Sequence, residues 1–255
     1  MSLTTFSGFT YGHDISEDNQ FIDFNEDGST EIGAQIKIGS YTLQTFIDAV
    51  SNAMNEAGDN TYTVTVDRAT RLITITGSAP FNLTVVSGSH FEISAFALMG
   101  FTTNRSGSSS YVGNQPSGYL YEPQYKLQKY IDFNDYVESV DSSVNTSASG
   151  IVEVVSFGQN QFMECNITYV TNIVGQGVIK NNPSGISDLR AFMNYAIQKK
   201  PMEFIPDLLT PGVYVPCILE KTPRNSKGVG FQLYELYSKG LANYFETGTL
   251  TFRKV

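Results

Sequence analysis

The sequence contains no tryptophan, two cysteines and two histidines among its 255 residues. So few histidines and cysteines, dispersed along the chain, cannot supply the ligand spacing of a structural zinc site. Because Cys165 and Cys217 lie in apolar, strand-like segments, we interpret both as buried free thiols, in accord with folding in a reducing cytoplasm.

Charge is also scarce: charged residues make up 16% of the chain, and the net charge is −9. Lys199-Lys200 is the only adjacent basic pair, so the sequence has no basic run of the kind that binds phosphates. We therefore expect no sequence-specific nucleic-acid binding. No stretch approaches the roughly 20 apolar residues of a membrane span, so we expect no membrane insertion. Residues Met1–Thr10 lack a charged segment followed by an apolar core, which predicts no signal peptide.

Apolar residues make up 41% of the chain, with 15 Tyr and 17 Phe, enough for a core in each half. Residues 102–118 are the least hydrophobic stretch and are rich in Ser, Gly and Asn, which indicates a linker. Residues 1–20 are polar and aperiodic, and we interpret them as an N-terminal arm. The sequence therefore predicts an arm (1–20), a small α+β module (21–101), a linker (102–118) and a β-barrel or sandwich (119–255).

The first module reads as strand, helix, hairpin and strand. Ser40 is the expected N-cap of a helix that Gly58 ends, and five apolar residues of that helix recur at helical spacing on one face. Two alternating runs joined by a polar turn predict a hairpin. The helix stripe is Leu43, Phe46, Ile47, Val50 and Met54; the hairpin strands are 62–66 and 72–76; further strands are expected at 21–24, 34–38 and 81–86, and a short helix at 92–99.

The second half reads as antiparallel β structure with one helix laid across it. The strand-like runs 151–157 and 162–170 are separated by Gly158-Gln159-Asn160, which predicts a hairpin between them. An apolar stripe from Ile186 to Ile197 predicts a helix that Pro201 terminates. Three closing strands are expected at 202–205, 213–220 and 248–254, so the fold class is α+β, mainly β, with two domains.

The residues from Asp23 to Gly28 resemble the start of an EF-hand loop, which requires oxygen ligands at alternate positions. The twelfth position, where a bidentate Glu is needed, is Ala34. We therefore interpret this segment as a turn between strands, and we expect no dependence on divalent metal.

Other candidate groups are similarly incomplete. His90 follows Ser87 and Ser89, so a Ser–His–acid arrangement is conceivable, but no nucleophile-elbow motif surrounds either serine. His13 lies in the expected arm. Glu203 and Asp207 could form a carboxylate pair of the glycosidase type, although any acidic chain contains such pairs. The sequence thus predicts no catalytic, cofactor-binding or metal-binding residues and a protein that is not an enzyme.

Several short segments of the first module occur in a characteristic order: Ile22-Asp23-Phe24-Asn25-Glu26, Gly39-Ser40-Tyr41-Thr42-Leu43, Ala53-Met54-Asn55, Tyr62-Thr63-Val64, Ile73-Thr74-Ile75, Gly88-Ser89 and Ala97-Leu98-Met99-Gly100-Phe101. Through them, residues 20–101 resemble a module of structural proteins from tailed phages and other large DNA viruses. The second half has a hairpin (151–170), a helix (186–198) and a closing strand (248–253), and in this order of elements it resembles the β-barrel-plus-helix of the tail-tube and distal-tail superfamily.

This resemblance implies a virion protein, made in the host cytoplasm, that assembles as a ring in the tail, neck or baseplate. Its expected partners are copies of itself and other virion proteins. We expect the runs 162–170 and 248–252 to be open sheet edges that pair with neighbouring subunits, and the acidic charge to line a bore that passes DNA. The alternative is a receptor- or carbohydrate-binding module of a tail fibre or adhesin; a glycan hydrolase would rest only on the abundant carboxylates.

Overall fold

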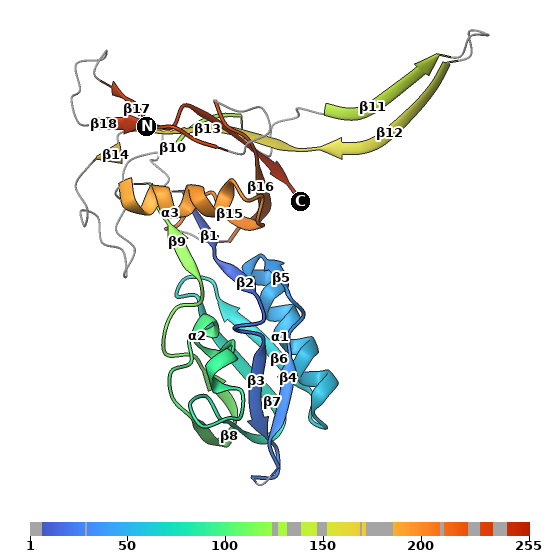
Figure 1. Ribbon diagram of the computed structural model, residues 1–255, viewed down its shortest axis with the longest axis vertical. Helices are drawn as coiled ribbons and strands as arrows, with labels where there is room; N and C mark the ends of the chain where they lie inside the picture. The colour runs from blue at the N-terminus through green and yellow to red at the C-terminus, as the bar shows by residue number, and fades with distance from the viewer. Residues whose placement is uncertain are drawn as a thin grey trace. The chain divides into compact units, whose positions relative to one another are not determined.

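The computed structural model describes residues 7–28, 30–123, 127–131, 139–146, 152–168, 170–171, 186–209, 212–223, 230–236 and 244–255. The protein is α+β and mainly β, and its strands pair antiparallel. Two compact units are present (Figure 1). The N-terminal unit comprises Gly8–Glu122 and Lys200–Tyr214, and the C-terminal unit comprises Met1–Ser7, Pro123–Lys199 and Val215–Val255.

The boundaries of these units correct the expected ones. Residues 8–15 are not an arm, because they form two strands whose apolar side chains are buried. Residues 105–112 are not linker but a strand of the N-terminal sheet. Residues 200–214 lie far along the chain yet belong to the N-terminal unit. The low hydrophobicity of 102–118 reflects an exposed strand at the border of a sheet, where few side chains are buried.

The main sheet of the N-terminal unit has the order β4-β3-β7-β6, and β8 pairs with the other side of the long strand β7. The expected hairpin 62–66/72–76 is confirmed, with Val64 opposite Ile75 in the register. The expected strands 72–76 and 81–86 are one continuous strand, β7. The bounds are β3 Phe21–Asn25, β4 Ile32–Gln35, β6 Tyr62–Asp67, β7 Leu72–Leu83 and β8 Arg105–Val112.

The helix α1 (Leu43–Ala57) packs its apolar stripe into the core of this unit, and the expected helix is confirmed. Its N-cap is Thr42 rather than Ser40, because Thr42 and Thr45 form a reciprocal capping box: Thr45 N donates to Thr42 Oγ1 at 3.2 Å, and Thr42 N donates to Thr45 Oγ1 at 2.9 Å. Gly58 follows the last helical residue, as expected.

Between β7 and β8 the chain forms two short helices, η1 (Phe91–Ile93) and α2 (Phe96–Met99). Gly100 ends α2 in the left-handed region at φ 81°, and a Cβ there would lie 1.9 Å from the carbonyl oxygen of Gln115. Glycine is therefore required at this position by both the backbone conformation and the close approach of the 114–118 segment.

Two smaller groups of strands complete the N-terminal unit. The strand β1 lies between β9 and β15, so residues from three distant parts of the sequence share one sheet. Phe9 of β1 and Phe204 of β15 are fully buried, with ring centroids 5.2 Å apart. The strands β2 and β5 form a separate pair. The bounds are β1 Gly8–Tyr11, β2 His13–Ile15, β5 Gly39–Tyr41, β9 Tyr119–Tyr121 and β15 Met202–Ile205.

In the C-terminal unit, four strands pair in the order β10-β13-β19-β16. The strands β14, β18 and β17 form a small second group, and β11 pairs with β12. The bounds are β10 Leu127–Ile131, β11 Ser139–Thr146, β12 Val152–Asn160, β13 Phe162–Ile167, β14 Val170–Thr171, β16 Val215–Lys221, β17 Tyr234–Glu235, β18 Tyr244–Glu246 and β19 Thr249–Lys254.

The expected hairpin between 151–157 and 162–170 is wrong. The residues Gly158-Gln159-Asn160 continue β12, and Asn160 is opposite Ser139 of β11. The strand β13 instead pairs with β10 and β19. A turn-prone triplet can extend a strand when a long partner strand offers hydrogen bonds along its whole length, and β11 is such a partner.

The helix α3 (Ile186–Ala196) is confirmed, and its side chains Leu189, Phe192 and Met193 are fully buried. Lys199, just beyond the helix, donates to the carbonyl oxygens of Leu219 and Glu220 in β16, at 2.6 Å each. The helix is thereby tied to the sheet of its own unit. Cys165 and Cys217 are buried free thiols, as expected.

Candidate functional site

His13 occupies a buried polar cluster in the N-terminal unit, not an arm. Its side chain is 1% exposed, and Nε2 lies 3.2 Å from Ser117 Oγ, which in turn donates to the carbonyl oxygen of Leu98 at 2.9 Å. Nδ1 is buried and has no partner. This arrangement fits a neutral ring with the proton on Nε2, because a protonated ring would need an acceptor at Nδ1 as well.

The guanidinium of Arg71 binds the same segment of chain as His13. It donates to the carbonyl oxygens of Ser117 and Gly118, at 3.2 Å each, and its residue is 7% exposed. Burial, with Arg71 as the second cause, lowers the pKa of His13 to about 3. The cluster is thus built to hold the imidazole neutral, which suits a structural role in joining β2 to the 114–118 segment.

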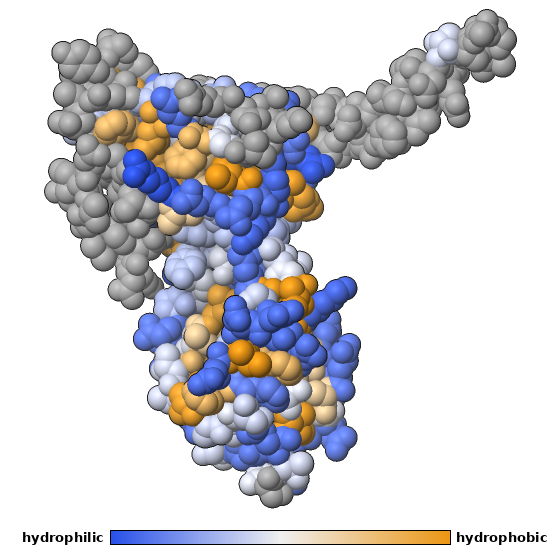
Figure 2. All heavy atoms as spheres, in the orientation of Figure 1, coloured by the Kyte–Doolittle hydropathy of each residue, from blue (hydrophilic) through white to orange (hydrophobic). Residues whose placement is uncertain are grey.

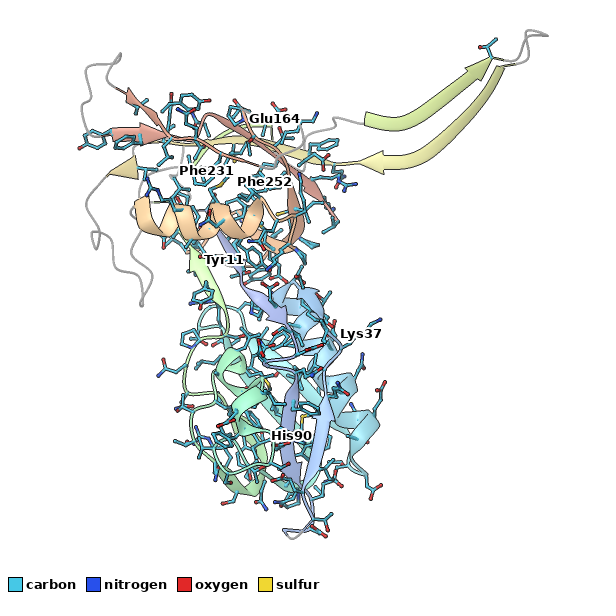
Figure 3. The ribbon with its side chains drawn as sticks, in the orientation of Figure 1. Tyr11, Lys37, His90, Glu164, Phe231 and Phe252 are labelled. Atoms are coloured by element: carbon cyan, nitrogen blue, oxygen red, sulfur yellow. The ribbon has the colours of Figure 1, made fainter. Side chains whose placement is uncertain are left out.

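His90, labelled in Figure 3, lies in a second cluster. Its ring is half-buried and stacks on Phe21, with ring centroids 4.1 Å apart. The carboxylate of Asp23 is fully buried and accepts from the backbone N of His90 at 2.6 Å and from Nδ1 at 2.8 Å. A Cβ at Gly88 would lie 2.3 Å from Asp23 Oδ2, so this turn needs glycine to approach the carboxylate. Asp23 therefore holds the turn and the imidazole together.

A Ser–His–acid constellation is not formed by these groups. Ser89 Oγ lies 3.2 Å from Nδ1 of His90, the same ring nitrogen that Asp23 engages. In a catalytic triad the nucleophile and the acid contact opposite ring nitrogens, so that the base can accept the nucleophile's proton. Ser89 and His90 are neighbours in the sequence, but Asp23 lies 67 residues away from His90. Its contact with the imidazole could be seen only in the structure.

The three carboxylates of the EF-hand-like segment turn to separate partners. Asp23 binds His90 as described above, whereas Asp27 Oδ1 accepts from the backbone N of Thr30 at 2.9 Å. Glu26 accepts from the backbone N atoms of Asp59 and Asn60 and from Tyr62 Oη. Burial alone would raise the pKa of Glu26, but these hydrogen bonds outweigh it and lower the pKa. Within the described ranges, no group of three His, Cys, Asp or Glu side chains is arranged to hold a metal ion.

Glu203 and Asp207 are not a pair. Glu203 is 2% exposed, forms an ion pair with Arg68 and accepts from the backbone N of Gln44 at 2.9 Å. Its carboxylate therefore lies at the N-terminal end of α1, where the helix dipole favours negative charge. Asp207 Oδ1 instead accepts from the backbone N of Leu209 at 3.0 Å. Glu203 therefore has a structural role: it connects residues 200–214 to α1 within the N-terminal unit.

The expected open edges are both interior strands. The strand β13 has β10 on one side and β19 on the other, and β19 lies between β13 and β16. Most residues of these two strands are paired on both sides, so neither strand forms the open edge that we expected. The scarcity of charge in these runs, where Glu164 is the one charged residue, reflects their central position rather than an exposed edge.

The strand β8 borders the N-terminal sheet, and side chains of β8 and β7 accept hydrogen bonds from its backbone. Tyr111 Oη accepts from Ser108 N at 2.8 Å and donates to the carbonyl oxygen of Phe81 at 2.6 Å. Ser108 Oγ accepts from Ser110 N at 3.2 Å, and Asn82 Oδ1 accepts from Gly107 N at 3.1 Å. The bonds through Tyr111 and Asn82 connect the backbone of β8 to the neighbouring strand β7.

The strands β11 and β12 form a two-stranded ribbon. Seven residue pairs connect them, from Ser139 opposite Asn160 to Thr146 opposite Val152. In the described part of the chain, neither strand pairs with any other strand. Figure 1 shows the ribbon as a separate pair of long arrows. We use the name ribbon for residues 139–146 and 152–160 below.

Figure 2 shows separate orange areas on the N-terminal unit, where apolar residues reach the surface. The exposed apolar residues of this unit include Val86 at 58%, Phe91 at 52% and Leu209 at 70% exposure. A hollow of about 460 Å³ is lined by Gln20, Gln35, Ile36, Lys37 and Ile38. Among the described residues, no helix is long and apolar enough to cross a membrane.

Sequence reasoning missed the His13 cluster and the ribbon. Ser117 lies 104 residues from His13, and no local pattern connects them. Comparison of the chain with protein-family models gave no match, and comparison with curated protein sequences gave none either.

Proposed function

We propose that the protein is a non-enzymatic structural component of a tailed-phage virion. In this proposal it assembles with copies of itself and with other virion proteins in the tail, neck or baseplate. The ribbon is the main observation in favour of assembly. The resemblance of the two halves to tail and virion modules is the reason for proposing a phage particle.

The argument from the ribbon is energetic. A two-stranded hairpin alone is at best marginally stable in water, because it cannot bury an apolar face. The ribbon spans eight residues in β11 and nine in β12, longer than the usual strand of about five or six. A ribbon of this length becomes stable once its strands pair or pack against another surface. A neighbouring subunit supplies that surface in an assembling protein.

The symmetry of the contact between subunits depends on where the ribbon docks. A ribbon that extends from one subunit and docks on a different surface of the next makes a heterologous contact. Repetition of such a contact closes into a ring or continues as a tube. This route replaces the pairing through β13 or β19, whose edges are occupied.

The test compares the parent chain with a variant that lacks the ribbon. Val140 and Gln159 are opposite each other, so residues 141–158 can be replaced by Asn-Gly, a two-residue hairpin turn. We expect electron microscopy and native mass spectrometry to show rings or tubes for the parent and monomers for the variant. Circular dichroism and thermal unfolding check that the variant is folded. A parent that stays monomeric at every concentration, alone or with particles lacking this protein, would refute the proposal.

A receptor- or carbohydrate-binding module remains the second candidate, and one observation favours it. His90 and Phe21 form a stack in which the imidazole is half-buried, and the neighbouring Phe91 is 52% exposed. Aromatic faces next to polar groups are suited to sugar rings. A glycan array distinguishes the two functions: specific glycan binding that is lost in Phe91→Ala, by a protein that stays monomeric, supports the second candidate.

A further inference from the structure

The two units differ sharply in charge. The N-terminal unit contains 15 acidic and 5 basic residues, a net charge of −10, and the C-terminal unit contains 10 acidic and 11 basic residues, a net charge of +1. The whole-chain value of −9 therefore conceals an acidic unit and a nearly neutral one.

Most of the acidic charge of the N-terminal unit is on its surface, and most of its basic charge is not. Among the described residues of this unit, Lys37 is the single exposed cation. Arg68 is paired with Glu203, Lys200 with Asp14, and Arg71 is buried against carbonyl oxygens. Nine carboxylates are exposed: Glu17, Asp18, Asp27, Glu31, Asp48, Glu56, Asp59, Asp67 and Glu92.

Some of these carboxylates are placed where they oppose folding. The last turn of α1 has no basic residue and ends near Glu56, although the C-terminal end of a helix carries partial negative charge. Asp59 follows just beyond the helix. Charges arranged against the dipole, in a unit of high net charge, reduce the stability of that unit through self-repulsion. Stabilisation of the unit therefore does not explain Glu56 and Asp59.

High net charge of one sign also keeps protein surfaces from associating. From this and from the position of the ribbon we propose that copies of the protein contact one another through the C-terminal unit, while the carboxylates of the N-terminal unit keep the N-terminal units of neighbouring copies apart. This inference rests on the proposed function and names the contacting partner as the C-terminal unit of a second copy.

The proposal predicts the direction in which salt changes assembly. The screening length is about 30 Å at 0.01 M ionic strength and about 8 Å at 0.15 M. Repulsion between acidic units is therefore strong at low salt and largely screened at physiological salt, whereas contacts made by a nearly neutral unit change little. Assembly strengthens as salt is added. Contacts between the acidic unit and a basic surface would weaken instead.

The experiment measures the concentration of half-assembly by analytical ultracentrifugation at 0.01 M and 0.15 M ionic strength, using the full chain. A neutralised variant carries Glu17→Gln, Asp18→Asn, Glu56→Gln and Glu92→Gln. A matched variant adds charge at exposed positions of the same unit, with Asn52→Asp, Thr63→Glu and Ala97→Glu. We expect the parent to assemble at an about tenfold lower concentration at the higher salt, the neutralised variant to respond less, and the acidified variant to respond more.

The possible results distinguish failure of the charge inference from failure of the proposed function. Assembly of the parent that weakens with salt, or an equal response of all three proteins, overturns the charge inference and leaves the proposed function standing. Assembly by no protein at any salt concentration overturns the proposed function, and the inference with it.

Discussion

Acid should destabilise the N-terminal unit through His13 in particular. The pKa of His13 is about 3 in the folded protein, because burial and Arg71 disfavour the cation, and the ordinary value is 6.5. The unfolded chain therefore binds one more proton than the folded chain between these two pH values. The stabilisation is complete above pH 6.5 and is lost as the pH falls toward 3.

The size of the effect follows from the same two values. Each pH unit between them changes the free energy of unfolding by about 1.4 kcal/mol. Lowering the pH from 7.5 to 5.0 crosses about 1.5 of these units, so His13 alone should contribute a loss of about 2 kcal/mol. His13→Gln removes the titrating group and keeps a polar side chain that can contact Ser117.

The assay is urea unfolding of both proteins at several pH values, followed by circular dichroism. Other titrating groups are shared by the two proteins, so their contributions cancel in the difference between parent and variant. That difference should change by about 2 kcal/mol between pH 7.5 and 5.0. Because the chain has two histidines, NMR can also follow the ring of each one directly. Identical pH dependence in the two proteins, or a folded-state titration of His13 near 6.5, would refute the reasoning.

Two further predictions concern single residues. Glu203→Ala should lower the free energy of unfolding of the N-terminal unit by about 3 kcal/mol, because Arg68 loses its carboxylate partner and the N-terminal end of α1 loses an acceptor. Asp207→Ala, on the same segment, is the control and should cost far less. Equal losses in the two variants would contradict the role assigned to Glu203. Cys165 and Cys217 are each 0% exposed, so neither should react with a thiol reagent in the folded protein, and both should react in denaturant; rapid labelling of the native chain would show that the core opens.

Local patterns in the sequence determined several elements. The apolar stripe and Gly58 defined α1 to within one residue of its end, because one face of a helix must be buried and a glycine stops it. The hairpin of β6 and β7 was defined in the same way, by alternation on either side of a polar turn. The thiols of Cys165 and Cys217 were assigned to the interior from their apolar neighbours alone.

Only the tertiary structure decided which segments meet. The pattern of β12 indicates a strand but not its partner, and the turn-prone residues at its end suggested β13 rather than β11. Asp23 and His90, like Glu203 and Arg68, are brought together across 67 and 135 residues. Periodicity reports which side of an element is buried, whereas pairing between distant elements depends on hydrogen bonds and charges that have no local pattern. For the same reason, the sequence determined the net charge of the protein, and only the fold decided that one unit carries it.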